Sequence, residues 1–180
     1  GQVSTTPDQA LFALDAGEGE TIPSFAEAAA LCRQSGLLAN VEIKPAQGMA
    51  RQTAEVVTRA ALQHWAGAEL APLLSSFSLE ALAIARDLAP HLQRGLLLEN
   101  LPANWPQLAR ELAVHTLHCP ADVINEPFMA EARALGLPVL VFTVNDEKQA
   151  KMLFSLGVQG VFTDTLRPET TAYKALQSAG

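Results

Sequence analysis

Short apolar runs alternate with longer amphipathic stretches along the whole chain. The apolar runs have the composition of strands and predict six of them, at 38–45, 71–77, 94–100, 115–121, 137–144 and 158–164. The intervening stretches repeat apolar residues at helical spacing and predict helices at 48–67, 78–90, 104–114, 125–136, 145–157 and 167–177. A further helix is predicted at 24–36, before the first strand. The predicted order is therefore strand and helix in regular alternation.

Residues typical of helix ends support these boundaries. Ser78, Asn104 and Asn125 stand where N-caps are expected, and Asn145 or Asp146 does so for the helix at 145–157. Glycines follow three helices, at positions 67, 136 and 157. The helix at 48–67 has an apolar face that we expect to be buried, formed by Val56, Ala60, Leu62 and Trp65.

Alternating strands and helices define an α/β fold with a parallel sheet. A length of 180 residues fits a single domain, 1–180, with a sizeable core. Two architectures satisfy this order, a doubly wound open sheet and a (β/α)8 TIM barrel, and periodicity alone leaves both open. Neither a GxGxxG sequence nor a P-loop follows any predicted strand, so the sequence has no nucleotide-binding motif.

Composition narrows the classes of partner. Hydrophobic residues make up 49% and charged residues 17%, which argues against disorder. The net charge of −7 argues against nonspecific binding to nucleic acid or an anionic membrane, and we expect no transmembrane span and no signal peptide. Cys32 and Cys119 are far apart and form no metal-binding spacing. We interpret them as reduced, buried side chains, with a disulfide or a catalytic thiol as alternatives.

Polar residues recur at the carboxyl ends of the predicted strands. In "VEIKP" the two-residue period places Glu42 and Lys44 on one face and Val41 and Ile43 on the other. The charged pair is either a structural salt bridge at a strand end or part of a site. Both architectures place their sites at this edge of the sheet, so the repeated placement favours a functional edge.

Five segments together resemble the glycerophosphodiester phosphodiesterase family: "LANVEIKP", "PLLSSF", "RGLLLE", "LPVLVFTVND" and "GVQGVFTDTLRPE". Their order and spacing are similar to strands three to eight of that family's TIM barrel, the C-terminal two thirds of the fold. The resemblance implies hydrolysis of glycerophosphodiesters to an alcohol and sn-glycerol 3-phosphate. It also implies a small-molecule substrate, a bound Mg²⁺ or Ca²⁺ and a cytoplasmic setting.

The resemblance assigns roles to individual residues. Glu42 matches one of three carboxylate metal ligands, and Lys44 matches a lysine near the phosphate. Phe142 and Asn145 stand where the family has an aromatic residue and an asparagine, which would contact the glycerol carbons and a hydroxyl. The alternatives are core packing for Phe142 and a helix cap for Asn145. Ser76 and His118 end predicted strands, and we expect both at the substrate site, with a structural, hydrogen-bonded histidine as the alternative for His118.

Other family motifs are not in this sequence. These are an HRG motif on the first strand, an acidic pair on the second and an HD motif after it, which contain the acid and base histidines and two metal carboxylates. We therefore assign no catalytic residue here, and we expect a preceding segment to supply these groups. The shortness of "LDAGEGETIP" suggests a splice at Gly17–Glu18. The alternatives are a non-catalytic binding domain or inactive fragment of the same barrel, and a sphingomyelinase D-like member of the superfamily.

Overall fold

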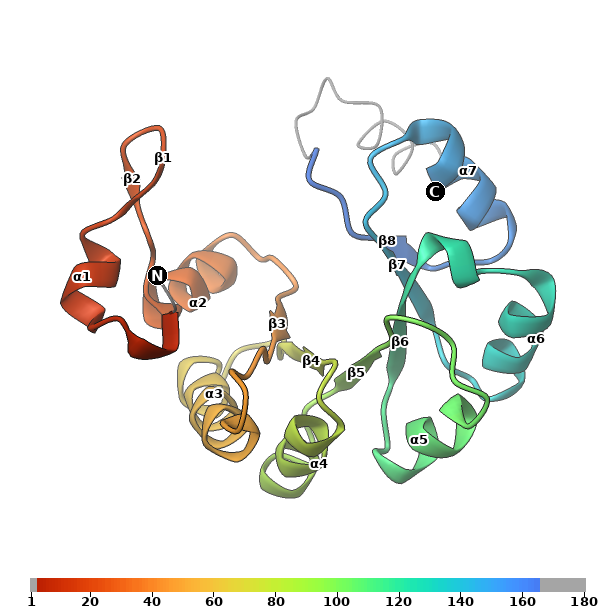
Figure 1. Cartoon of the computed structure of the whole chain (residues 1–180), viewed down its shortest axis with the longest axis horizontal. Helices are drawn as coiled ribbons and strands as arrows, with labels where there is room; N and C mark the ends of the chain where they lie inside the picture. Colours follow the sequence, from red (N-terminus) through yellow and green to blue (C-terminus); the bar gives the residue numbers. More distant parts are fainter. Residues whose placement is uncertain (1–2, 166–180) are drawn as a thin grey trace.

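The computed structural model describes residues 3–165, and the helix predicted at 167–177 lies outside that range. Its main feature is a sheet of six parallel strands in sequential order, β3 to β8. Their bounds are β3 Asn40–Glu42, β4 Leu73–Ser76, β5 Arg94–Leu97, β6 Thr116–Pro120, β7 Val139–Phe142 and β8 Gly160–Val161. Figure 1 shows that the strands follow one another around an arc, a curled half-barrel with helices on its outer side. The sequence correctly predicted α/β alternation, and of the two architectures the curvature selects the barrel type.

Helices connect successive strands. They are α3 Ala50–His64, α4 Leu79–Leu88, α5 Trp105–Glu111, α6 Glu126–Ala134 and α7 Glu147–Ser155, with a short 3-10 helix at Ala121–Val123. The predicted caps are confirmed for three of them, because the side chains of Ser78, Asn125 and Asp146 accept hydrogen bonds from Ala81 N, Phe128 N and Gln149 N. Asn104 holds the N-cap position of α5 without such a bond, and Asp146 rather than Asn145 caps α7.

The buried face of α3 differs from the expected one. Its buried residues are Ala54, Thr58 and Ala61, whereas the side chain of Val56 is 61% exposed. Trp65, just after the helix, is buried as predicted. Ala61 and Ala54 join Ala81 and Ala85 of α4 in one buried cluster, so small side chains allow these two helices to pack closely. The predicted face is therefore wrong for Val56, whereas Leu62 is partly buried against this cluster and Ala60 is half-buried.

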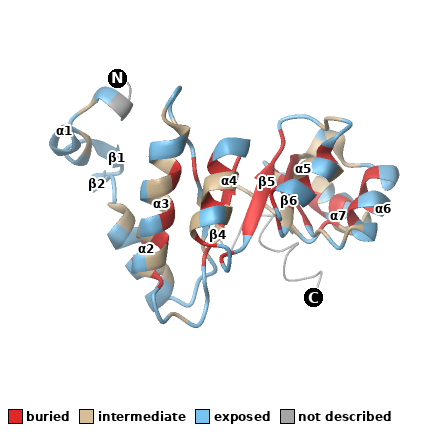
Figure 2. Ribbon diagram, turned by 90° about the horizontal axis from the view of Figure 1, so that it is seen from below, coloured by how far each residue is buried: buried red, intermediate tan, exposed pale blue. Residues whose placement is uncertain are grey.

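The first part of the chain lies beside the half-barrel rather than within its sheet. It contains a 3-10 helix Val3–Thr5, helix α1 Asp8–Phe12, and a hairpin of β1 Asp15–Gly17 and β2 Glu20–Thr21. Helix α2 Phe25–Gln34 follows, with a capping box between Ser24 and Glu27. Figure 2 shows this part mostly exposed, in contrast to the buried sheet. Glu18 and Gly19 form the tip of the hairpin, directly after Gly17 at the end of β1, with φ of 57° and 85°.

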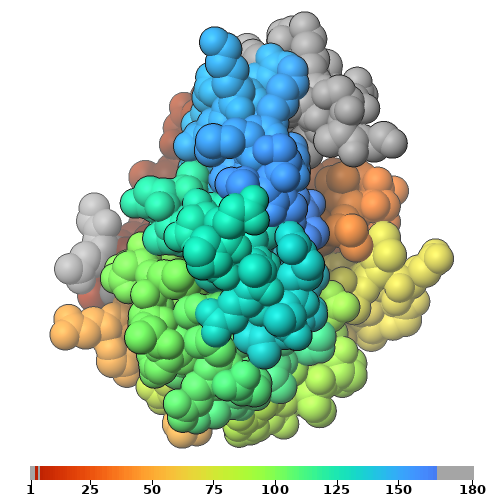
Figure 3. Space-filling model, turned by 90° about the vertical axis from the view of Figure 1, so that its right-hand side faces the viewer, coloured from red at the N-terminus to blue at the C-terminus, as the bar shows by residue number. Residues whose placement is uncertain are grey.

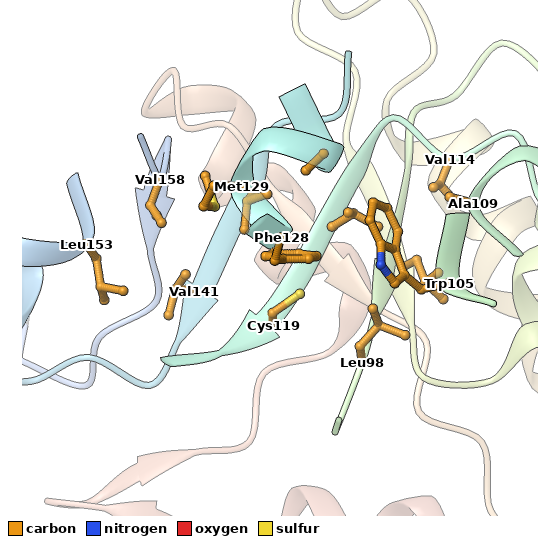
Figure 4. Packing of buried hydrophobic residues seen from close by; sticks show 14 of the residues in the cluster. Leu98, Trp105, Ala109, Val114, Cys119, Phe128, Met129, Val141, Leu153 and Val158 are labelled. Carbon is orange, nitrogen blue, oxygen red and sulfur yellow. The ribbon is translucent and has the colours of Figure 1, made fainter. Parts of the chain in front are cut away.

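The core lies between the outer face of the sheet and the surrounding helices. Its largest cluster joins β5 to β8 with α4 to α7 and includes the residues labelled in Figure 4. Trp105 and Phe128 pack edge to face with ring centroids 5.3 Å apart. Cys119 belongs to this cluster, which agrees with its interpretation as a buried, reduced side chain. Figure 3 shows the outer surface that covers it, where successive segments lie side by side in chain order.

Both cysteines of the chain are free in the structure. Burial raises the pKa of the Cys119 thiol to about 12, so that side chain stays protonated at neutral pH and is unsuited to nucleophilic catalysis. Cys32 on α2 is partly exposed. No helix within residues 3–165 has the length and apolar character needed to cross a membrane.

Candidate functional site

A cavity of about 230 Å³ opens on the concave face of the sheet, towards the carboxyl ends of the strands. It is lined by residues from β3, β5, β6, β7 and the segments that follow β4, β7 and β8: Asn40, Glu42, Phe77, Leu97, His118, Phe142, Thr143 and Phe162. These residues converge because parallel strands all present their carboxyl ends at one edge. Three of the predicted site residues, Glu42, His118 and Phe142, are therefore brought together at one cavity.

Glu42 and Lys44 lie on the same face of β3 and its extension, as the two-residue period predicts. Both are exposed, whereas Ile43 between them is 1% exposed and faces the core. Their exposure follows from the position of β3 at the edge of the sheet. The ion pairs within residues 3–165 join Arg51 to Glu55, Arg86 to Asp87 and Lys151 to Glu147, so no salt bridge links Glu42 to Lys44. Glu42 lines the cavity, whereas Lys44 is not among its lining residues.

Ser76 hydrogen-bonds to the backbone of Ile43, the residue between Glu42 and Lys44. Its hydroxyl donates to the Ile43 carbonyl at 2.6 Å and accepts from the Ser78 amide at 3.0 Å. The Ile43 amide in turn donates to the Ser75 carbonyl at 2.7 Å. Ser76 is fully buried and does not line the cavity. The hydroxyl therefore extends the β3–β4 pairing and fixes the segment from which Glu42 and Lys44 project.

His118 forms part of the floor of the cavity and is fully buried. Its Nε2 lies 2.9 Å from the Thr116 hydroxyl, and its ring contacts Phe162 with centroids 5.2 Å apart. Gly95 on the neighbouring strand leaves room for the His118 ring, because a Cβ at position 95 would lie 2.7 Å from His118 Nε2. Nδ1 has no hydrogen-bond partner among the described residues. Burial lowers the pKa of His118 to about 4, so its imidazole is neutral at pH 7.

Aromatic rings form much of the cavity wall. Phe142 at the end of β7 meets Phe77, just after β4, edge to face with centroids 5.9 Å apart. Both rings line the cavity together with Phe162. Phe142 is only partly buried, so part of its ring remains available to the carbon atoms of a ligand.

Asn145 lies three residues after Phe142 and is exposed, but it does not line the cavity. Its Nδ2 donates to Asp164 Oδ2 at 3.1 Å, and its Oδ1 accepts from the Thr163 hydroxyl at 2.9 Å and the Asp164 amide at 2.9 Å. The helix-cap alternative for Asn145 is wrong, since Asp146 performs that role. Asn145 thus joins the segments that follow β7 and β8.

Residues 3–165 contain no group of three His, Cys, Asp or Glu side chains placed to hold a metal ion. Glu42 alone provides a carboxylate at the cavity, so the described residues do not form a complete site for Mg²⁺ or Ca²⁺. The metal role of Glu42 stays a prediction.

Asn40, Leu97 and Phe162 also line the cavity, and sequence reasoning did not single them out. A signal for two of them existed in the chain. Asn40 precedes Glu42 by two positions and so shares its face, and Leu97 is the register partner of His118 on the neighbouring strand. The second of these required the strand register, which the sequence does not provide.

A curled parallel sheet with a cavity at the carboxyl ends of its strands is the arrangement of TIM-barrel proteins. Residues 2–167 match the glycerophosphoryl diester phosphodiesterase family, and the chain belongs to it. The resemblance inferred from the strand-end motifs is confirmed.

Known relatives agree with this assignment. A glycerophosphodiester phosphodiesterase from Caldanaerobacter subterraneus subsp. tengcongensis is 28% identical over 153 residues, which are 84% of this chain and 61% of that protein. The chain thus spans about three fifths of this curated relative. An Oleispira antarctica phosphodiesterase, solved in complex with the product sn-glycerol-3-phosphate, is 33% identical with a TM-score of 0.89. That match covers 99% of this chain and 72% of the other.

A more distant solved structure shares the fold alone. The Parabacteroides distasonis glycerophosphodiester phosphodiesterase is 18% identical, with a TM-score of 0.77, over 95% of this chain and 69% of that one.

Proposed function

We propose that this chain forms the substrate-binding part of an enzyme that hydrolyses glycerophosphodiesters to an alcohol and sn-glycerol 3-phosphate. Membership of the family and the 33% identity to a phosphodiesterase solved with that product support the proposal. The observation that carries it is the pair Glu42 and Lys44, which are exposed on one face of the chain and not paired with each other, with Glu42 lining an aromatic cavity. The ammonium of Lys44 has no ion-pair partner among residues 3–165, which suits a phosphate diester with its one negative charge.

The reaction requires that water form a P–O bond while the bond to the leaving alkoxide breaks and a proton reaches that oxygen. We assign Lys44 to a phosphate oxygen, where its charge offsets the charge that grows in the transition state. Phe142 would pack against the glycerol carbons, and His118, which lines the cavity, is a further candidate for substrate binding. Because Ser76 and Asn145 already bond to the protein, we expect both to act mainly by holding their segments.

A divalent ion would supply positive charge for the phosphate oxygens, and we propose Glu42 as one of its ligands. The described residues provide only this carboxylate at the cavity, so we derive no step through the ion. The cytoplasmic setting also stays a prediction, which cell fractionation would test.

A second candidate is a binding domain without turnover, and one observation favours it. His118 is the sole histidine of residues 3–165 that lines the cavity, and with a pKa near 4 it is a poor general acid or base at neutral pH. A domain that retained Glu42, Lys44 and the aromatic wall would still bind the product.

The test is an assay of glycerophosphocholine hydrolysis in the presence of Mg²⁺, Ca²⁺ or a chelator. The release of sn-glycerol 3-phosphate is the quantity measured. For a protein that includes the segment expected to supply the acid and base histidines, we expect metal-dependent turnover. Glu42→Gln should lower kcat/KM at least about tenfold, since this change removes a charged ligand without changing size. The matched control is Glu80→Gln, at an exposed position of α4, which should leave turnover unchanged.

The binding of sn-glycerol 3-phosphate, measured by calorimetry, separates the two candidates. Binding without turnover would support the binding domain. Neither binding nor turnover would refute both, and equal turnover by Glu42→Gln and its control would refute the role given to Glu42.

A further inference from the structure

The side chain of Asn145 behaves as an extension of the β7–β8 ladder. The backbone pairing of these strands continues past their ends, because Phe162 N donates to Val141 O and Val144 N donates to Phe162 O, each at 2.8 Å. One residue later the carboxamide replaces the backbone. Asn145 Oδ1 accepts from the Asp164 amide at 2.9 Å, as a strand carbonyl would.

Most of the hydrogen-bonding capacity of this carboxamide is used within the protein. An asparagine side chain has two acceptor positions on oxygen and two donors on nitrogen. Both acceptor positions are occupied, by the Thr163 hydroxyl and the Asp164 amide, and one donor is directed to the Asp164 carboxylate. The bonds within residues 3–165 therefore leave one N–H of Asn145 for a ligand.

The bonded segments support two walls of the cavity. Phe142 and Thr143 line it from the segment just before Asn145, and Phe162 lines it from the residue before Thr163. Strand β8 has two residues and, among the described strands, pairs only with β7. Few backbone bonds therefore hold Phe162, and the bonds from Asn145 supplement them at the carboxyl edge, where the site lies.

We propose that Asn145 is a positioning residue, and that its bonds to Thr163 and Asp164 hold Phe142, Thr143 and Phe162 in the arrangement that binds the glycerol phosphate group. The proposal rests on the proposed function, and it differs from a direct bond between Asn145 and substrate. Asp164 has the same positioning role as the partner of Asn145, although it does not line the cavity.

Exchanging the side chains of Asn145 and Asp164 tests the positioning role of Asn145. Asn145→Ala should lower kcat/KM by about 10- to 100-fold, because it releases the walls that orient the substrate. Asn145→Asp alone should do the same, since two carboxylates would then face each other. Asn145→Asp combined with Asp164→Asn restores the pair with donor and acceptor exchanged, at unchanged net charge, and should recover kcat/KM to within about threefold of the parent. The exposed Asn104→Ala, whose side chain makes no cap bond, is the control.

Amide hydrogen exchange at Asp164 provides a second measurement that does not depend on turnover. The amide should exchange about tenfold faster or more in Asn145→Ala and regain its protection in the double variant. If the full chain has no activity, the proposed function fails. The role of Asn145 can then still be tested by amide hydrogen exchange at Asp164 and by the affinity for sn-glycerol 3-phosphate.

Two outcomes would overturn it. One is an Asp164 amide equally protected in Asn145→Ala and the parent. The other is a double variant that regains protection but not kcat/KM, or not product affinity if turnover is absent, which would show a direct contact between Asn145 and substrate.

Discussion

The buried guanidinium of Arg94 offers a quantitative test of how the half-barrel is held together. Arg94 begins β5, is 2% exposed and has no carboxylate partner among the ion pairs of residues 3–165. Its side chain donates to five backbone carbonyls that follow or end α4 and α5: Ala89, Pro90, Leu92, Leu112 and Ala113. The negative ends of two helix dipoles thus surround one cation.

The magnitude follows from the two short bonds. The distances to Leu92 O and Ala113 O are 2.6 and 2.9 Å, whereas the other three are 3.4 Å and contribute little. A bond from a charged donor contributes about 1.5–3 kcal/mol. Arg94→Met keeps the apolar stem but removes both bonds, so we expect the free energy of unfolding to fall by about 3–5 kcal/mol. Arg94→Lys keeps the charge and loses the forked geometry, and should cost about half as much.

Urea denaturation followed by tryptophan fluorescence measures this, because Trp65 and Trp105 are both buried. Arg110→Met, at an exposed position of α5, is the control and should change stability by less than about 0.5 kcal/mol. If Arg94→Met unfolded within about 1 kcal/mol of the parent, the desolvation cost of the guanidinium would cancel its bonds, and the reasoning would be wrong.

Two further predictions concern stability. Burial holds the pKa of His118 at about 4, below its usual 6.5, so the unfolded chain binds a proton at a higher pH than the folded one. The free energy of unfolding should therefore fall as the pH drops from 6.5 to 4, by at most about 3 kcal/mol from this group. In urea titrations at several pH values, His118→Gln should flatten this pH dependence. An unchanged slope would contradict the lowered pKa of His118. Ala113 has a positive φ of 48°, so Ala113→Gly should stabilise the fold by about 0.5–1 kcal/mol. The control Ala28→Gly, at an exposed position within α2, should cost about 1 kcal/mol. Thermal melts in which both variants lose stability would contradict the argument that Ala113 is strained.

Local signals were enough to define the elements of this fold. Ser78 and Asn125 cap their helices as expected, because a cap depends only on the next three residues. Glu42 and Lys44 share a face because strand geometry alternates side chains regardless of what surrounds the strand. The family was identifiable for the same reason, since its strand-end motifs are short and contiguous.

Contacts between distant segments decided the remaining features. Val56 is exposed and Ala54 buried because α3 packs against α4 through small side chains, a choice that depends on the neighbouring helix. Asn145 bonds residues 18 and 19 positions away, and nothing near it in sequence shows that its oxygen completes the β8 side of the ladder.

The sequence by itself determined the order of strands and helices, the face shared by Glu42 and Lys44, and membership of the phosphodiesterase family. Only the tertiary structure showed that Arg94 is buried among carbonyls, that His118 is neutral above Gly95, and that Ser76 and Asn145 bond to the backbone of their neighbours. The physical reason is that hydrogen-bond partners and desolvation depend on strand register and helix packing, which are set by the whole chain rather than by any one segment.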